Sequence, residues 1–320
     1  MIASDQTGAA REASDTASDA LTPACVCGHR IAIILAATLA LLASGCPRPH
    51  LVARPYPPPP AARLREALLA RQRLVTSMNA RARATSWLGG DRVRATVMML
   101  VDRPGRLRFE AEVSLQGTVA VLATDGRRFA FLDTMKNELR RGPACPANVA
   151  SLIRIPLGPA DVAAILLGDL RLPPARGGGA TESQDTVDWD PARAADVLAV
   201  RRADGWLRIL MQDANNAAAT AGSSHQDPRI LGAIATGPDG RPRWRVAFED
   251  FVTIEAADPG GGPARQVALP QTIRFAEGDT SFDEGVEIKF RQRSVNESAA
   301  AEAFELASVP NAVTIEVGCP

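Results

Sequence analysis

Histidine is the side chain most often used as a general base near neutral pH, and this chain of 320 residues has three. His29 precedes an apolar run, His50 lies in a proline-rich stretch, and His225 lies in a stretch rich in Gly, Ser and Asn. None of them can be grouped in a folded core with a serine and an aspartate as a catalytic triad. The sequence therefore predicts a protein that is not an enzyme and has no catalytic residues.

Metal and phosphate chemistry are not indicated either. Cys145 and Cys319 have no near neighbour of the type that a zinc site needs. The glycines at 177–179 and 260–262 lack the strand, helix and lysine of a phosphate-binding loop. Lys plus Arg and Asp plus Glu both number 36, so no overall basic charge attracts nucleic acid. We expect no metal, no cofactor and no nucleic-acid partner.

A different chemistry is indicated at Cys46. The uncharged run Ile31–Leu42 has the length of the apolar part of a secretory signal, whereas a spanning helix needs about 20 apolar residues. Ala43-Ser44-Gly45 then lead directly to the cysteine. This arrangement resembles the lipobox of bacterial lipoproteins, which implies a signal peptide over 1–45 and a diacylglyceryl lipid, with palmitate as a typical acyl chain, on Cys46. The alternative is a buried apolar helix that happens to end in Gly-Cys.

The residues on either side of Cys46 bear on export and location. Residues 1–24 are acidic where a signal should be basic, so we expect translation to start downstream, near Val26. The proline-rich linker that follows Cys46, residues 47–60, predicts an extended, semi-rigid spacer of about 3.1 Å per residue. Pro47 is not the aspartate that retains enterobacterial lipoproteins in the inner membrane, so we expect a lipid anchor in the outer membrane, facing the periplasm.

Cysteine counting agrees with export. Once the signal is removed and Cys46 carries lipid, only Cys145 and Cys319 remain. Two thiols in an oxidising compartment are expected to pair, which would hold the C-terminus to the middle of the domain. Two unpaired buried cysteines are the alternative.

The first half of the folded part begins with one helix and continues with strands. Leucines, Val75 and Met78 at spacings of three and four predict an amphipathic helix over 61–79. Apolar and polar residues then alternate, and turn residues such as those at 102–105 and 125–126 separate the runs. The pattern predicts an antiparallel series of strands at 93–101, 107–113, 119–123 and 129–133.

The second half is also rich in strands. Residues 145–172 predict two short helices around a proline-marked corner. Stretches at 173–184, 213–228 and 256–266 are expected to be exposed loops. One α+β domain over 61–320, with a C-terminal extension at 296–320, accounts for the pattern. Further strands are predicted around 187–190, 197–202, 206–211, 230–236, 244–254, 271–275 and 286–293.

Several strings, in this order and spacing, are similar to the LolA/LolB superfamily, and most to LolB, the outer-membrane receptor for lipoproteins. They thread most of residues 61–296 and comprise RLRFEAEVSLQGTVAVLATDGRR at 106–128, IRIPLGPADVAAILLGDLRLP at 153–173, DGRPRWRVAFEDF at 239–251, LPQTIRF at 269–275 and VEIKFRQRSVN at 286–296. The resemblance implies an incomplete antiparallel β-barrel of about 10–11 strands, whose covering helices enclose an apolar cavity for acyl chains.

The resemblance also implies site residues. The loop Ser114-Leu115-Gln116-Gly117 corresponds to the family's membrane-insertion loop, with Leu115 at its tip. Apolar positions of the strands and helices would line the cavity, although the same residues could equally fill an ordinary core. They are Val97, Met99, Phe109, Phe131, Ile165, Trp244, Phe248, Phe275, Ile288 and Phe290.

Two classes of function follow. The first is a monomeric, membrane-anchored receptor that binds lipid or lipoprotein acyl chains, takes lipoproteins from a LolA-like periplasmic carrier and inserts them into the outer membrane. It predicts a hollow core and an exposed Leu115. The second is a non-enzymatic envelope sensor or scaffold of the same fold, which predicts a filled core and a protein partner bound through the long loops.

Overall fold

The computed structural model describes residues 51–88, 91–113, 116–173, 185–212, 228–297, 299–307 and 309–319. The predicted signal peptide, Cys46 and the start of the linker lie outside these ranges, and so do Leu115 and the stretches 174–184 and 213–227. What the sequence predicts for those residues stays a prediction.

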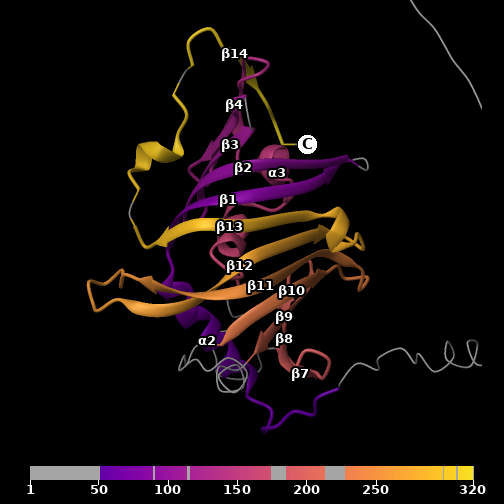
Figure 1. The fold of residues 1–320 in the computed structure, drawn as a ribbon. Helices are drawn as coiled ribbons and strands as arrows, with labels where there is room; N and C mark the ends of the chain where they lie inside the picture. The colour runs from indigo at the N-terminus through magenta and orange to yellow at the C-terminus, as the bar shows by residue number, and fades with distance from the viewer. Residues whose placement is uncertain are drawn as a thin grey trace, which may run out of the picture. The chain divides into compact units, whose positions relative to one another are not determined.

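Within the described residues, fourteen strands form one sheet in the order β14-β6-β5-β4-β3-β2-β1-β13-β12-β11-β10-β9-β8-β7 (Figure 1). All neighbouring strands are antiparallel except β14 and β6, which are parallel. β14 and β7 are free edges, so the sheet does not close. The strands are β1 (Ser77–Leu88), β2 (Asp91–Asp102), β3 (Arg106–Val113), β4 (Gly117–Thr124), β5 (Arg128–Asp133), β6 (Glu138–Pro143), β7 (Thr186–Asp190), β8 (Ala195–Arg202), β9 (Gly205–Gln212), β10 (Arg229–Thr236), β11 (Pro242–Ala256), β12 (Arg265–Glu277), β13 (Val286–Val295) and β14 (Val313–Glu316).

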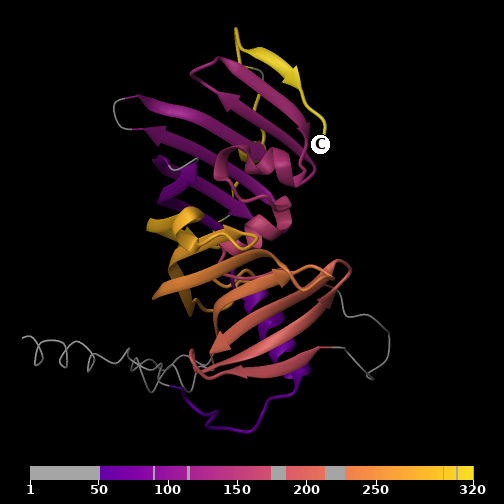
Figure 2. The same cartoon turned by 90° about the vertical axis from the view of Figure 1, so that its right-hand side faces the viewer.

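Helices accompany the sheet, and α3 and α4 lie along one face of it (Figure 2). α3 contacts β4 and β5, α4 contacts β2 and β3, and α2 contacts β8. Pro146 and Pro159 occupy the first turns of α3 and α4, where the missing proline N–H is tolerated. No helix in the described ranges is long and apolar enough to cross a membrane. The helices described are α2 (Ala61–Leu74), α3 (Pro146–Ile153), α4 (Pro159–Leu166) and the short η1 (Phe282–Glu284) and η2 (Ala301–Phe304).

The two faces of the sheet differ in polarity. We call the face that α3 and α4 cover the inner face and the opposite one the outer face. In β3, Leu107, Phe109 and Ala111 are buried on the inner face, and the residues between them are partly exposed. Similar alternation in β2 and β13, buried runs in β4, β8 and β12 and the apolar side of each helix together produce one continuous hydrophobic core. The predicted α+β fold, an incomplete antiparallel barrel with covering helices, is confirmed.

The structure corrects the predicted helix over 61–79. α2 ends at Leu74, and residues from Ser77 onward form β1. β1 buries Ala80 and Ala82 on the inner face, between exposed arginines such as Arg81. Alanine has high helix propensity and low strand propensity, so its alternation in β1 is a weak strand signal.

The strand number also differs, with fourteen in the described residues against the expected 10–11. Besides β1, the additional strands are β6 and β14. Leu139 is the one fully buried residue of β6, and β14 has four residues that pair with β6 from far along the chain. Strands this short and polar are fixed by tertiary pairing and leave little periodicity in the sequence.

The C-terminal extension is fixed at two places. A disulfide joins Cys145 to Cys319, as predicted, with their Cα atoms 6.1 Å apart. Before it, the tail crosses the outer face, where the Phe304 ring is buried beneath the Arg106 guanidinium. The Arg141 guanidinium donates a hydrogen bond to the Leu306 carbonyl at 2.9 Å. The tail therefore covers the outer face near β3 and β6.

Candidate functional site

The described part of the linker, Leu51–Pro60, lies against the β7 edge of the sheet, and we call it the linker segment. The Val52 N–H donates to the Pro191 carbonyl at 2.9 Å, just after β7. In return, the Trp189 indole N–H donates to the Val52 carbonyl at 2.8 Å. These two hydrogen bonds hold the backbone of the linker segment beside the turn between β7 and β8.

Side chains strengthen this attachment. Arg54 forms an ion pair with Asp196 at 2.8 Å, and the Tyr56 hydroxyl donates to the same carboxylate at 2.9 Å. Asp196 is 2% exposed, and a buried carboxylate without such partners would destabilise the fold. The Arg54 guanidinium carbon lies 5.3 Å from the centre of the Trp189 ring, over its face. The Tyr56 and Trp189 rings form a T-shaped pair with their centres 5.9 Å apart. Residues 51–60, the described part of the predicted semi-rigid spacer, are therefore attached to the folded domain.

The linker segment closes one side of a pocket of about 520 Å³, which we call the linker pocket. The first turns of α2 form another side, and Asp196 of β8, Met211 of β9 and Pro228, directly before β10, complete it. Most of the lining side chains are apolar. The pocket is lined by Tyr56, Pro57, Pro58, Pro59, Pro60, Arg63, Leu64, Ala67, Asp196, Met211 and Pro228.

The size and lining of the linker pocket suit an apolar ligand. Ligand pockets measure about 300–1,000 Å³ and have mostly apolar walls with a few polar groups. Proline rings, Leu64 and Met211 supply such walls, and methionine adapts its shape to different ligands. Asp196 is already neutralised by Arg54. Among the described residues Arg63, which is exposed, has no acidic group within 4 Å and is the available cation of the lining.

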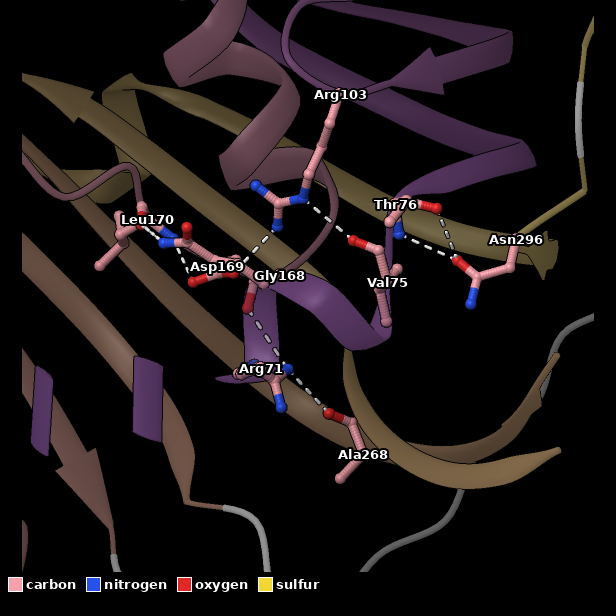
Figure 3. Close-up of polar contacts among 10 residues, drawn as sticks. Arg71, Val75, Thr76, Arg103, Gly168, Asp169, Leu170, Ala268 and Asn296 are labelled. Carbon is pink, nitrogen blue, oxygen red and sulfur yellow. Dashed lines mark hydrogen bonds and ion pairs between the residues drawn. The ribbon is translucent and has the colours of Figure 1, made fainter. Parts of the chain in front are cut away.

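The helix that borders the pocket is held at its other end by polar contacts (Figure 3). Arg71, on α2, is 3% exposed and donates to the Ala268 carbonyl of β12 at 3.0 Å. After α2 the Asn296 side chain accepts the Thr76 N–H at 2.9 Å and donates to the Leu74 carbonyl at 2.7 Å. These bonds satisfy backbone groups at the end of α2 and set its position against β12 and β13.

A buried ion pair extends this network. The Asp169 carboxylate, 2% exposed at its side chain, pairs with Arg103 at 2.9 Å, and Arg103 also donates to the Val75 carbonyl at 3.0 Å. Burial raises the pKa of Asp169, against the opposing effect of Arg103 and Arg71. Burial also lowers the pKa of Arg103, and it lowers that of Arg293, together with the Arg71 charge, to about 10. Burial therefore disfavours the charged forms of Asp169, Arg103 and Arg293 at the end of α2.

The raised pKa of Asp169 predicts a pH dependence of stability. Because the folded protein holds this proton more tightly than the unfolded chain, the contribution of Asp169 is complete below its ordinary value of 3.8 and is lost as pH rises through the raised value. Relative to Asp169→Asn, we therefore expect the wild type to lose stability as pH rises above that acid range. Urea unfolding at a series of pH values measures this, and parallel stability curves for the two proteins would contradict it.

The ten residues predicted to line a cavity all lie in the buried core. Trp244 and Phe275 stack with ring centres 6.2 Å apart. The space that Ile165 and Trp244 border has no volume for a water molecule. Phe275 borders a second pocket, of about 370 Å³, which is also lined by α3, the end of β1, the end of η1 and the start of β13. The ten residues therefore lie together on the inner face of the sheet and on the helix that covers it. That they line an acyl cavity stays a prediction.

The predicted insertion loop lies between β3 and β4. Gln116 and Gly117 are exposed, and Gly117 has a φ of 72°, a left-handed conformation that glycine adopts without strain. Leu115 lies outside the described residues, as does Cys46. Neither Gln116 nor Gly117 contributes to the linker pocket.

Sequence reasoning misses the residues of the linker pocket. Leu64 is recognised only as part of a helix, Met211 only as part of a strand, and the prolines at 57–60 only as a spacer. One signal is present in the sequence, since four prolines directly precede α2 and give an apolar, preordered surface at its start. That these prolines and Met211 of β9 line one pocket depends on contacts between residues far apart in the chain.

Comparison with known proteins gives limited results. No protein-family model and no curated protein matches the chain. A LolA superfamily protein from Nitrosomonas europaea has a TM-score of 0.45 at 10% identity, over 76% of this chain and 97% of its own. A domain assigned as an outer membrane lipoprotein-sorting protein from Vibrio parahaemolyticus has 0.45 at 7%, over 76% and 95%. A DUF1329 family protein from Desulfovibrio piger has 0.42 at 11%, over 77% and 97%. Scores this low do not establish a family or a function for this chain.

Proposed function

We propose that this protein is a lipid-anchored envelope lipoprotein that binds an acyl chain of a lipid or lipoprotein in its linker pocket. The observation that carries the proposal is a pocket of about 520 Å³ with mostly apolar walls, one of them formed by the linker segment itself. An acyl chain is the apolar ligand that a membrane supplies, and burying it is favourable by about 0.8 kcal/mol per methylene.

In its finer form the proposal is a LolB-like receptor at the outer membrane. Cys46 carries the lipid anchor, a LolA-like carrier delivers the cargo, and Leu115 enters the membrane when the cargo is released. The protein acts as a monomer and as a binding protein rather than an enzyme. The order of sequence strings between residues 106 and 296 supports this form, together with the open sheet and its covering helices.

We expect Ala67→Trp to occupy part of the linker pocket and weaken acyl-chain binding about tenfold, since displacing two methylenes removes about 1.6 kcal/mol. Binding of a fluorescent fatty acid to the purified full chain measures this. Leu69→Trp is the matched control, because Leu69 is on the same helix, is 39% exposed and does not line the pocket. Equal affinities of Ala67→Trp and the wild type for the fatty acid would show that the acyl chain binds elsewhere on the protein.

A specific observation favours a second function. The interior beside Ile165 and Trp244 is filled, as expected for a sensor or scaffold whose core holds no ligand. If the wild type does not bind the fatty acid, and mass spectrometry finds no lipid in the purified protein, the acyl-binding proposal is wrong and the scaffold function is favoured.

A further inference from the structure

The outer face of the sheet carries a group of cations at its centre. Arg83 of β1, Arg94 of β2, and Lys289 and Arg291 of β13 lie on three neighbouring strands, and we call them the basic patch. Arg83 is directly opposite Lys289 in the strand register, and Arg94 is diagonal to Arg83. Both arginines and Arg291 are exposed.

The strand register places like charges together without compensation. Directly opposite residues on one face have their Cβ atoms about 5 Å apart, so Arg83 and Lys289 repel each other. In the described part of the chain none of the four cations has a carboxylate within 4 Å. Two acidic residues diagonal to the patch by register, Glu112 and Glu287, are paired with Arg81 at 3.6 Å and Arg274 at 3.4 Å. Asp250 accepts a hydrogen bond at 2.8 Å from the hydroxyl of Thr272, which is directly opposite Lys289.

Other cations of the outer face have partners within the protein. Arg108 pairs with Glu110 at 2.7 Å, and the tail covers both Arg106 and Arg108. Arg274 reaches Glu249 at 3.4 Å as well as Glu287. Unlike Arg108 and Arg274, the basic patch has no carboxylate partner among the described residues, so its mutual repulsion lowers stability unless an external anion offsets it.

We propose that the basic patch binds the surface of a bilayer that contains anionic phospholipid. Four cations spread over three neighbouring strands match an extended layer of phosphate groups better than one small anion. Next to them Met98 of β2, directly opposite Arg81, is 38% exposed and adds an apolar side chain for the headgroup region. The patch is separate from the linker pocket, so it can bind a membrane whether or not the pocket holds an acyl chain.

The test compares vesicles of phosphatidylcholine with vesicles of equal parts phosphatidylcholine and phosphatidylglycerol, using the purified full chain with Cys46→Ser to exclude a lipid anchor. We expect tighter binding to the anionic vesicles, and we expect added salt to weaken it. Combining Arg83→Gln, Lys289→Gln and Arg291→Gln should weaken that binding about a hundredfold, since each cation contributes about fivefold. Binding to neutral vesicles should not change.

The matched control removes the same charge elsewhere. Arg127→Gln, Arg193→Gln and Arg241→Gln change three exposed arginines outside the patch and should leave anionic binding within about threefold of the wild type. Thermal unfolding should show that the patch variant is folded and at least as stable as the wild type. Equal binding of the wild type to both kinds of vesicle, or an equal loss in the control, would overturn the proposal. So would a preference of the patch for duplex DNA over anionic vesicles.

Discussion

Replacing both disulfide cysteines, Cys145→Ser with Cys319→Ser, is expected to lower the free energy of unfolding by up to about 5 kcal/mol. The bond joins residues 174 positions apart, so it removes a large loop-closure entropy from the unfolded chain. Apart from the disulfide, the end of the tail is held mainly by β14, which pairs with β6 over only four residues. Urea unfolding without reductant measures the change.

The matched control for this variant is the wild type unfolded in the presence of reductant, which opens the same bond without a substitution. It is expected to unfold at the same urea concentration as the disulfide variant. The disulfide variant should also be cleaved faster by protease within residues 299–319. Two free thiols at Cys145 and Cys319 in the native exported protein, or unchanged unfolding of the disulfide variant, would contradict the prediction.

Phe109→Ala is expected to lower the free energy of unfolding by about 3–5 kcal/mol, the usual cost of removing a phenyl ring from a packed core. Phe109 is fully buried on β3, between Met99 of β2 and Leu122 of β4, which are also buried. α4 contacts β3 and closes the inner face there. The lost ring would leave a cavity that these neighbours cannot fill without moving from close packing.

This variant also distinguishes a filled interior from a hollow one. If Phe109 lined an empty acyl cavity, the ring would have fewer contacts to lose, and its removal would cost less than about 2 kcal/mol. Met135→Ala is the control, because Met135 is 68% exposed, and its removal should change stability by less than about 0.5 kcal/mol. A small loss for Phe109→Ala would thus favour a lined cavity over a packed core.

Most strands were predictable because their alternation is carried by large apolar residues. In β3, for example, Leu107 and Phe109 alternate with charged residues, and a period of two on such side chains has no helical alternative. β1 fails this test because alanines occupy its inner face, and β14 fails because four residues are too few to show a period. For both strands the pairing partner decided the structure, and the partner is distant in sequence.

The candidate site was predictable only in part. The buried residues named as a possible cavity lining do meet on the inner face and its helices, since side-chain periodicity states which face is apolar. The periodicity of apolar residues does not predict whether the space between two apolar faces is filled, because that depends on how closely the helices approach the sheet. The attachment of the linker segment was also hidden, since Arg54 and Asp196 are 142 residues apart and each is unremarkable alone.

By itself, the sequence determined the α+β class, the antiparallel series of strands between residues 93 and 133 and the pairing of Cys145 with Cys319, because each depends on residue type, local spacing or counting. The lipid anchor at Cys46 stays a prediction. The tertiary structure alone decided where β1 begins, how the linker segment packs, that the linker pocket exists and that Arg83 lies opposite Lys289. The physical reason is that pockets and charge clusters arise from strand register and helix position, which are set by contacts between distant parts of the chain.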